Sequence, residues 1–117
     1  MASFANMLHV KLPAGEFTDS RNYFSTFTGK ESLSRVYNIE QPVDRGALAI
    51  VKNGWKYITP SNGPALMKEV NIETGYSNED QLYNLKDDPK ELTNLALTFP
   101  GKVKELKALL EKTKAEK

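Results

Sequence analysis

Apolar and polar residues alternate most clearly in the middle of the chain. Residues 34–40 read Ser-Arg-Val-Tyr-Asn-Ile-Glu, and three shorter apolar or aromatic runs follow at 47–52, 55–59 and 81–85. Alternation with a period of two, built from β-branched and aromatic residues, is typical of half-buried strands. Asn53-Gly54 separates the second run from the third, and this dipeptide favours the type I′ turn of a hairpin. The pattern therefore predicts a small antiparallel sheet of four strands.

The last stretch of the chain has a helical period instead. After Pro100-Gly101, apolar residues recur every three to four positions while lysines and glutamates fill the opposite face. The recurring positions are Val103, Leu106, Leu109, Leu110 and Thr113. Such an amphipathic helix needs an apolar surface, and the available one is a face of the sheet. We therefore predict an α+β fold, with a C-terminal amphipathic helix packed on one face of the sheet and short N-terminal helices.

The first 30 residues contain aromatic side chains but little continuous core pattern. Residues 2–10 predict a weak helix with three apolar side chains, Phe4, Met7 and Leu8, on one side. Asp19 and Ser20 are candidate N-caps for a second short helix that continues through Phe27, and Gly29 stands where a helix C-cap residue would. We expect residues 1–32 to form a strap or linker that lies on something larger.

Residues 60–80 separate the hairpin from the closing strand. This stretch holds Pro60, Gly63, Pro64 and Gly75, and within it the pattern at 66–70 predicts one helical turn. An excursion of this length from a tight hairpin is usually either functional or disordered.

Composition narrows the range of functions. The chain has 117 residues, a size typical of one domain, and 16 basic against 15 acidic side chains give a net charge of +1. That balance leaves no overall field for nucleic acid or for an acidic membrane. No apolar run is long enough to cross a bilayer, and residues 1–9 lack the features of a secretory signal. We expect neither nucleic acid nor a membrane as a partner.

Few side chains can carry chemistry. The absence of cysteine excludes disulfides, thiolate metal sites and a thiol nucleophile, and His9 is the only histidine. Asp87-Asp88-Pro89 could be read as a calcium-binding pair, but Asp-Pro after a strand favours a turn. Glu79-Asp80 is interpreted as a solvated loop pair. We predict no catalytic residue and no metal ligand in this chain.

Trp55 and Tyr57 share one face of their strand, so two interpretations stand. An exposed pair could stack on a sugar ring, whereas the same spacing is more often part of a sheet core. We favour the core.

Several segments together resemble the C-terminal subdomain of type I, arylsulfatase-like sulfatases. Residues 82–96, Leu-Tyr-Asn-Leu-Lys-Asp-Asp-Pro-Lys-Glu-Leu-Thr-Asn-Leu-Ala, are similar to that family's Leu-Tyr-Asp-Leu-x-x-Asp-Pro-x-Glu-x-x-Asn-Leu-Ala segment. Residues 49–58 resemble its Trp/Tyr-Lys-Tyr-Ile hairpin, with Lys52 where arginine is commoner. Residues 19–29 resemble its linker, and residues 3–8 the short helix before it. On this resemblance, residues 33–117 are the sulfatase C-terminal subdomain.

Residues 82–96 have a physical interpretation as a device that holds the fold. Asp88-Pro89 turns the chain, and residues 91–95 are expected to form a helical turn with Leu92 and Leu95 on the core side. Asn94 is expected to hydrogen-bond loop backbone.

The resemblance implies that the parent protein hydrolyses sulfate esters. It also implies that the parent uses calcium and a formylglycine residue, both on a catalytic domain that this chain lacks. The expected partners are that catalytic domain and, through it, a sulfated small molecule or carbohydrate. We expect this chain to be inactive alone. The resemblance leaves the parent's location open between export and the lysosome.

Three residues of the 60–80 stretch, Asn62, Lys68 and Tyr76, are predicted to lie at the rim of the parent's substrate cleft. The alternative function is a separate carbohydrate-binding or protein-interaction module that uses Trp55, Tyr57 and Tyr76 as stacking platforms. Apolar residues near the N-terminus would be partly exposed without the catalytic domain, which favours self-association of the isolated chain. These are Phe4, Leu8, Tyr23, Phe24 and Phe27.

Overall fold

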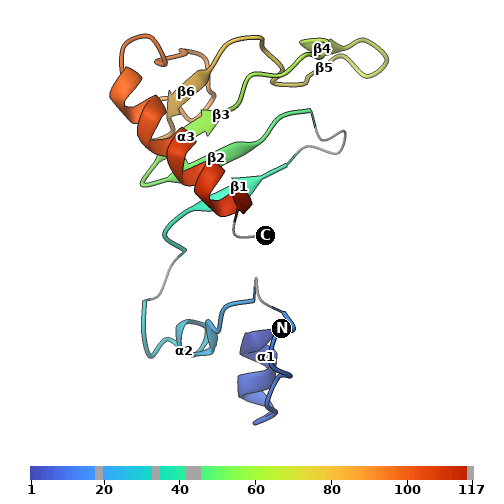
Figure 1. The fold of residues 1–117 in the computed structure, drawn as a ribbon, viewed down its shortest axis with the longest axis vertical. Helices are drawn as coiled ribbons and strands as arrows, with labels where there is room; N and C mark the ends of the chain where they lie inside the picture. The colour runs from blue at the N-terminus through green and yellow to red at the C-terminus, as the bar shows by residue number, and fades with distance from the viewer. Residues whose placement is uncertain (18–19, 33–34, 42–45, 116–117) are drawn as a thin grey trace. The chain divides into compact units, whose positions relative to one another are not determined.

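The computed structural model describes residues 1–17, 20–32, 35–41 and 46–115 (Figure 1). The chain divides into two compact units, Met1–Arg35 and Val36–Lys117. Within the described ranges, no helix is both long enough and apolar enough to cross a membrane. The assignment of residues 1–32 as a linker and of 33–117 as a subdomain stays a prediction.

The N-terminal unit contains two short helices, α1 (Ala2–Met7) and α2 (Phe24–Phe27). α1 is shorter than predicted, because the chain leaves the helix at Leu8 and His9 takes a left-handed φ of 54°. α2 begins after Tyr23, so the prediction that Ser20 caps it is wrong. Asp19 lies outside the described residues.

Two serine hydroxyls tie α1 to the segment before α2. Ser20 Oγ accepts a hydrogen bond from the Ala2 amide at 2.7 Å, and Ser3 Oγ accepts one from the Tyr23 amide at 2.7 Å. Ser20 is thus engaged by the other helix, which explains why it does not cap α2. Gly29 follows the C-cap of α2 with a φ of 69°, the left-handed conformation in which helices commonly end.

The second unit contains the predicted antiparallel sheet of four strands, in the order β1-β2-β3-β6. The strands are β1 (Asn38–Glu40), β2 (Ala49–Lys52), β3 (Trp55–Ile58) and β6 (Gln81–Asn84). The β2–β3 hairpin is confirmed, with φ of 52° at Asn53 and 81° at Gly54. A type I′ turn requires positive φ at both positions, which asparagine and glycine tolerate best. Residues 42–45 of the predicted turn and residue 34 of the predicted first strand lie outside the described residues.

One row of side chains across the sheet forms the core. The register places Ile39, Ile50, Tyr57 and Leu82 directly opposite one another on successive strands, and the last three are fully buried. α3 (Pro100–Ala115) crosses this face (Figure 1) and buries Leu106 and Leu110 against it. Each such side chain contributes about 1.5–3 kcal/mol when removed from water. The predicted α+β fold and its helix-covered sheet face are confirmed.

The stretch at 60–80 differs from the prediction. The expected helical turn at 66–70 is wrong, because the segment forms a second hairpin of β4 (Leu66–Met67) and β5 (Ile72–Glu73). Asn71 adopts a left-handed φ of 53°, which reverses the chain, and the Thr74 amide donates to the Ala65 carbonyl at 3.0 Å. A single helical turn fixes several residues for one hydrogen bond, so pairing of the two short strands is the more favourable local solution.

Candidate functional site

The structure brings two of the three predicted rim residues together. Asn62 is exposed, and its neighbour Gly63 lies so close to the Tyr76 ring that a Cβ atom there would stand 2.3 Å from Tyr76 Cδ2. Gly46 approaches the same ring near its hydroxyl. Tyr76 is half-buried, and its ring lies too close to Gly63 for a side chain at that position without a shift. Lys68 is exposed and follows β4, at the opposite end of the hairpin from Asn62.

Backbone and side-chain hydrogen bonds close the base of this hairpin. The Ser61 amide donates to the Ser77 carbonyl at 2.8 Å, and Gln81 Nε2 donates to the Gly75 carbonyl at 2.8 Å. Thr74 Oγ1 donates to the Pro64 carbonyl. These bonds give Asn62 and Tyr76 a fixed support, while the residues of β4 and β5 are exposed.

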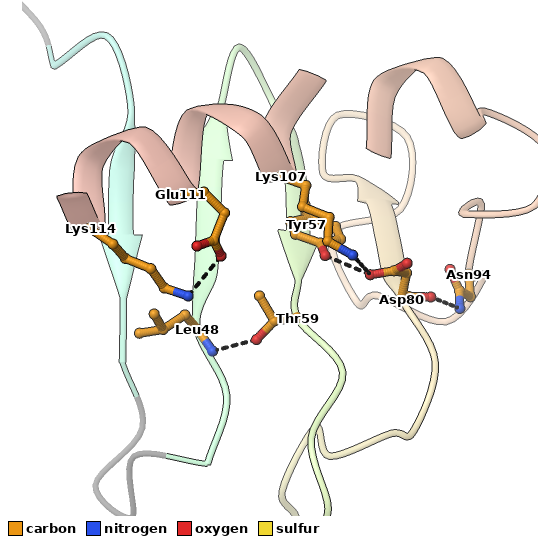
Figure 2. A network of polar contacts seen from close by, with 8 residues as sticks. All are labelled: Leu48, Tyr57, Thr59, Asp80, Asn94, Lys107, Glu111 and Lys114. Carbon is orange, nitrogen blue, oxygen red and sulfur yellow. Dashed lines mark hydrogen bonds and ion pairs between the residues drawn. The ribbon is translucent and has the colours of Figure 1, made fainter. Parts of the chain in front are cut away.

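Asp80 joins this region to the core (Figure 2). Its Oδ1 accepts a 2.6 Å hydrogen bond from the hydroxyl of the buried Tyr57, and Lys107 Nζ of α3 lies 3.8 Å from the same oxygen. Of the predicted solvated pair, Glu79 is exposed as expected, whereas Asp80 is half-buried and engaged by these contacts. A tyrosine at a core position of β3 needs a partner for its hydroxyl. From the sequence, one could therefore expect an acceptor near the Tyr57 hydroxyl. The sequence does not show that this acceptor is Asp80.

This contact predicts a pH dependence of stability. Burial, and then the hydrogen bond to Asp80, raises the pKa of Tyr57 above its ordinary value of 10.0. Burial raises the pKa of Tyr83 as well. The folded chain therefore holds these protons more tightly than the unfolded chain does, so stability is fully present below pH 10 and falls as the pH rises above it.

Urea unfolding between pH 8 and pH 11.5 measures this effect. Tyr57→Phe removes one titrating group, so we expect its stability to fall less steeply with pH than that of the unaltered chain. Parallel pH profiles for the two proteins would contradict the assignment. Tyr23→Phe in the N-terminal unit, which lacks the contact with Asp80, is the matched control.

The segment after β6 forms a turn, but not the helical turn that was predicted. Asp88 Oδ2 accepts the Thr93 amide at 2.8 Å, and hydrogen bonds from the Thr93 and Leu92 amides lower the pKa of Asp88. The interpretation of Asp88-Pro89 as a turn is confirmed. Glu91 has a left-handed φ of 56°, which interrupts any helix, and its carboxylate lies 2.8 Å from Lys56 Nζ.

The two leucines of this segment differ in burial. Leu95 packs against the core as predicted, whereas Leu92 is 79% exposed, so its placement on the core side is wrong. The left-handed residue at Glu91 is the reason, because it breaks the helical spacing that would have put both side chains on one face.

Asn94 confirms the predicted hydrogen bonding to loop backbone. Its Oδ1 accepts the Leu82 and Ala96 amides, both at 3.0 Å, and its Nδ2 donates to the Asp80 carbonyl at 3.1 Å (Figure 2). One side chain thus joins the edge strand β6 to the loop that leads into α3.

The aromatic pair of β3 belongs to the core. Tyr57 is fully buried, and Trp55 is half-buried with its ring 5.4 Å from that of Phe99 in an edge-to-face arrangement. The preference for packing over sugar stacking is confirmed. Tyr57 is not accessible as a stacking platform, so the alternative of a separate carbohydrate-binding module loses one of its three aromatic residues.

Among the residues that the structure describes, no group of three or more His, Asp or Glu side chains is placed to hold a metal ion. The described carboxylates with shifted pKa values serve other contacts: Asp88 holds the turn, and Glu105 lies between Lys102 and Lys52. The geometry found here is that of a supported surface hairpin.

Comparison with known proteins shows which proteins this chain is similar to. No family model matches it. It is 42% identical over 113 residues to an N-acetylgalactosamine-6-O-sulfatase of Bacteroides thetaiotaomicron, a match that covers 97% of this chain and 22% of the relative. A solved structure from the same organism, from work on the metabolism of multiple glycosaminoglycans, is 41% identical with a TM-score of 0.89 and covers 97% of this chain and 24% of that one.

A more distant structure shares the fold. It was solved in complex with its substrate, D-glucosamine-2-N,6-O-disulfate; it is 20% identical with a TM-score of 0.62, and the match covers 97% of this chain and 22% of that chain. The chain thus spans about a fifth of the length of the relatives that it matches, and it contains no counterpart of their catalytic domain. The resemblance found in the sequence is confirmed, because the chain matches the C-terminal subdomain of a sulfatase.

Proposed function

We propose that this chain is the C-terminal subdomain of a full-length protein that hydrolyses sulfate esters of carbohydrates. The observation that carries the proposal is the identity of 42% over 97% of the chain with an N-acetylgalactosamine-6-O-sulfatase. The resemblance to sulfatases implies calcium and a formylglycine residue, and we assign both to the catalytic domain of the full-length protein. The role of this chain is structural support.

The substrate class follows from the same relative. A hexosamine with a 6-O-sulfate is the first substrate to test, because the relative's name specifies that ester. The partners of this chain are then the catalytic domain and, through it, the sulfated sugar.

The hairpin adds a role at the rim of the substrate cleft. Its base is fixed by hydrogen bonds, and it presents Asn62 to solvent beside the half-buried Tyr76. An exposed amide and a phenol hydroxyl can donate to hydroxyl or sulfate oxygens of a sugar. Lys68 adds a positive charge at the other end of the hairpin and suits a sulfate of a longer substrate.

Kinetics of the full-length protein test this role. Asn62→Ala, Lys68→Ala and Tyr76→Phe should each raise KM for the sulfated sugar about 3- to 10-fold with little change in kcat, because each removes a contact made equally in the ground state and the transition state. Lys104→Ala on the exposed side of α3 is the control and should change neither constant. Unchanged kinetic constants in all three variants would exclude the rim role, and a full-length protein that releases no sulfate would exclude the function itself.

A further inference from the structure

Asparagine precedes glycine at two places in this chain. Asn53-Gly54 forms the turn between β2 and β3, and Asn62-Gly63 lies at the base of the β4–β5 hairpin. Both asparagines are exposed. Glycine has no Cβ atom, so its amide nitrogen reaches the side chain of a preceding asparagine with less hindrance than that of any other residue. An exposed Asn-Gly pair therefore tends to lose ammonia through a succinimide, provided that its backbone can rearrange.

The sheet restrains the first pair. Asn53 and Gly54 are held in the left-handed turn by the strand pairs next to them, and the Gly54 carbonyl accepts a hydrogen bond from the Leu85 amide at 2.8 Å. The same hairpin carries the fully buried Ile50 and Tyr57. For the Gly54 nitrogen to reach Asn53 Cγ the turn must open, and an opening that disturbs buried strands is rare.

The second pair is restrained far less. In the described parts of the chain, neither the Asn62 side chain nor the Gly63 amide has a hydrogen-bond partner, and the Ser61–Ser77 backbone bond lies just before them. Two residue pairs join β4 to β5, and all four residues are exposed. Opening of such a hairpin costs little free energy. Gly63 is nevertheless needed at its position, because the Tyr76 ring leaves no room there for a Cβ atom without a shift.

We propose that Asn62 is a site of spontaneous deamidation in the folded protein, whereas folding protects Asn53. The Gly63 amide nitrogen loses its proton and attacks Asn62 Cγ, and the new N–Cγ bond closes a succinimide. The bond from Cγ to the side-chain nitrogen breaks, and that nitrogen leaves with the proton as ammonia. Water then opens the ring at either carbonyl and yields aspartate or isoaspartate. Both products carry a carboxylate, so a neutral position becomes negative.

The consequence for the substrate rests on the proposed function. A carboxylate at position 62, beside Tyr76, repels a sulfate at the rim of the cleft, so deamidation lowers the affinity of the full-length protein as the protein ages. Isoaspartate also adds a methylene to the backbone before Gly63, which moves this residue relative to the Tyr76 ring.

Mass spectrometry of tryptic peptides tests the deamidation itself. Trypsin cleaves after lysine, so Asn53 lies on peptide 53–56 and Asn62 on peptide 57–68, each with a single asparagine. The 117-residue chain is incubated at pH 8, both folded and in guanidinium chloride. We expect folding to slow the deamidation of Asn53 about 100-fold, because the sheet must open first, and that of Asn62 by less than about 5-fold.

Asn62→Gln is the matched control, because glutamine closes a larger ring and does so more slowly. Peptide 57–68 of this variant should gain no carboxylate over the same period, while Asn53 reacts as before. Equal slowing of the two asparagines by folding, or faster reaction of Asn53 in the folded chain, would overturn the proposal.

Kinetics of the full-length protein separate the deamidation from the rim role. Asn62→Asp should raise KM for the sulfated sugar about 5-fold above the value for Asn62→Ala, because it adds a repulsive charge to the loss of the amide. Deamidation of Asn62 with equal KM values for these two variants would support the modification site and reject its effect at the rim.

Discussion

Replacement of Leu110 by alanine should lower the free energy of unfolding of the Val36–Lys117 unit by about 2–5 kcal/mol. Leu110 is fully buried where α3 meets the row of Ile50, Tyr57 and Leu82. The change removes apolar contacts and leaves a cavity that the sheet cannot fill, because its backbone is fixed by three strand pairings. Urea unfolding followed by circular dichroism measures the loss.

The matched control for this prediction is Leu97→Ala. Leu97 is 94% exposed, so its truncation should change the free energy of unfolding by less than about 0.5 kcal/mol. Equal losses from the two variants would mean that α3 does not cover the sheet as described.

Asn94→Ala should lower the free energy of unfolding by about 1–3 kcal/mol. The truncation leaves the amides of Leu82 and Ala96 and the carbonyl of Asp80 without their present partner. Asn94→Asp keeps the acceptor oxygen but cannot donate to the Asp80 carbonyl. It should therefore lower the free energy of unfolding by less than Asn94→Ala does, yet leave it below that of the unaltered chain.

Asn62→Ala is the control for Asn94, because Asn62 is an exposed residue of the hairpin base. We expect a change below about 0.5 kcal/mol in the same urea experiment. If Asn94→Ala is no more harmful than this control, water replaces the side chain fully and the segment does not hold β6.

Local patterns in the sequence were enough to predict most of the second unit. Alternation predicted the first strand, short apolar or aromatic runs predicted β2, β3 and β6, and Asn53-Gly54 predicted the hairpin turn. The helical spacing of Leu106 and Leu110 predicted α3. Each of these signals lies within a few neighbouring residues, and each agrees with the burial that the complete fold requires.

The contacts that were missed depend on residues far apart in the chain. Asp80 is engaged because Tyr57, 23 positions earlier, brings its hydroxyl to that point. The backbone of Glu91 is left-handed, and the Glu91 carboxylate lies 2.8 Å from Lys56 Nζ of β3, 35 positions earlier in the chain. The β4–β5 hairpin likewise depends on cross-strand pairing, and two-residue strands leave almost no periodic signal. The rim positions of Asn62, Lys68 and Tyr76 stay a prediction, because they concern a surface of another part of the full-length protein.

Sulfate release from a 6-O-sulfated N-acetylgalactosamine, assayed side by side for the full-length protein and for the 117-residue chain, tests the central claim most directly. If this chain is the supporting subdomain of a sulfatase, the full-length protein releases sulfate and loses that activity when calcium is removed, while the 117-residue chain releases none with or without calcium. Calcium-dependent release by the 117-residue chain alone would contradict the account.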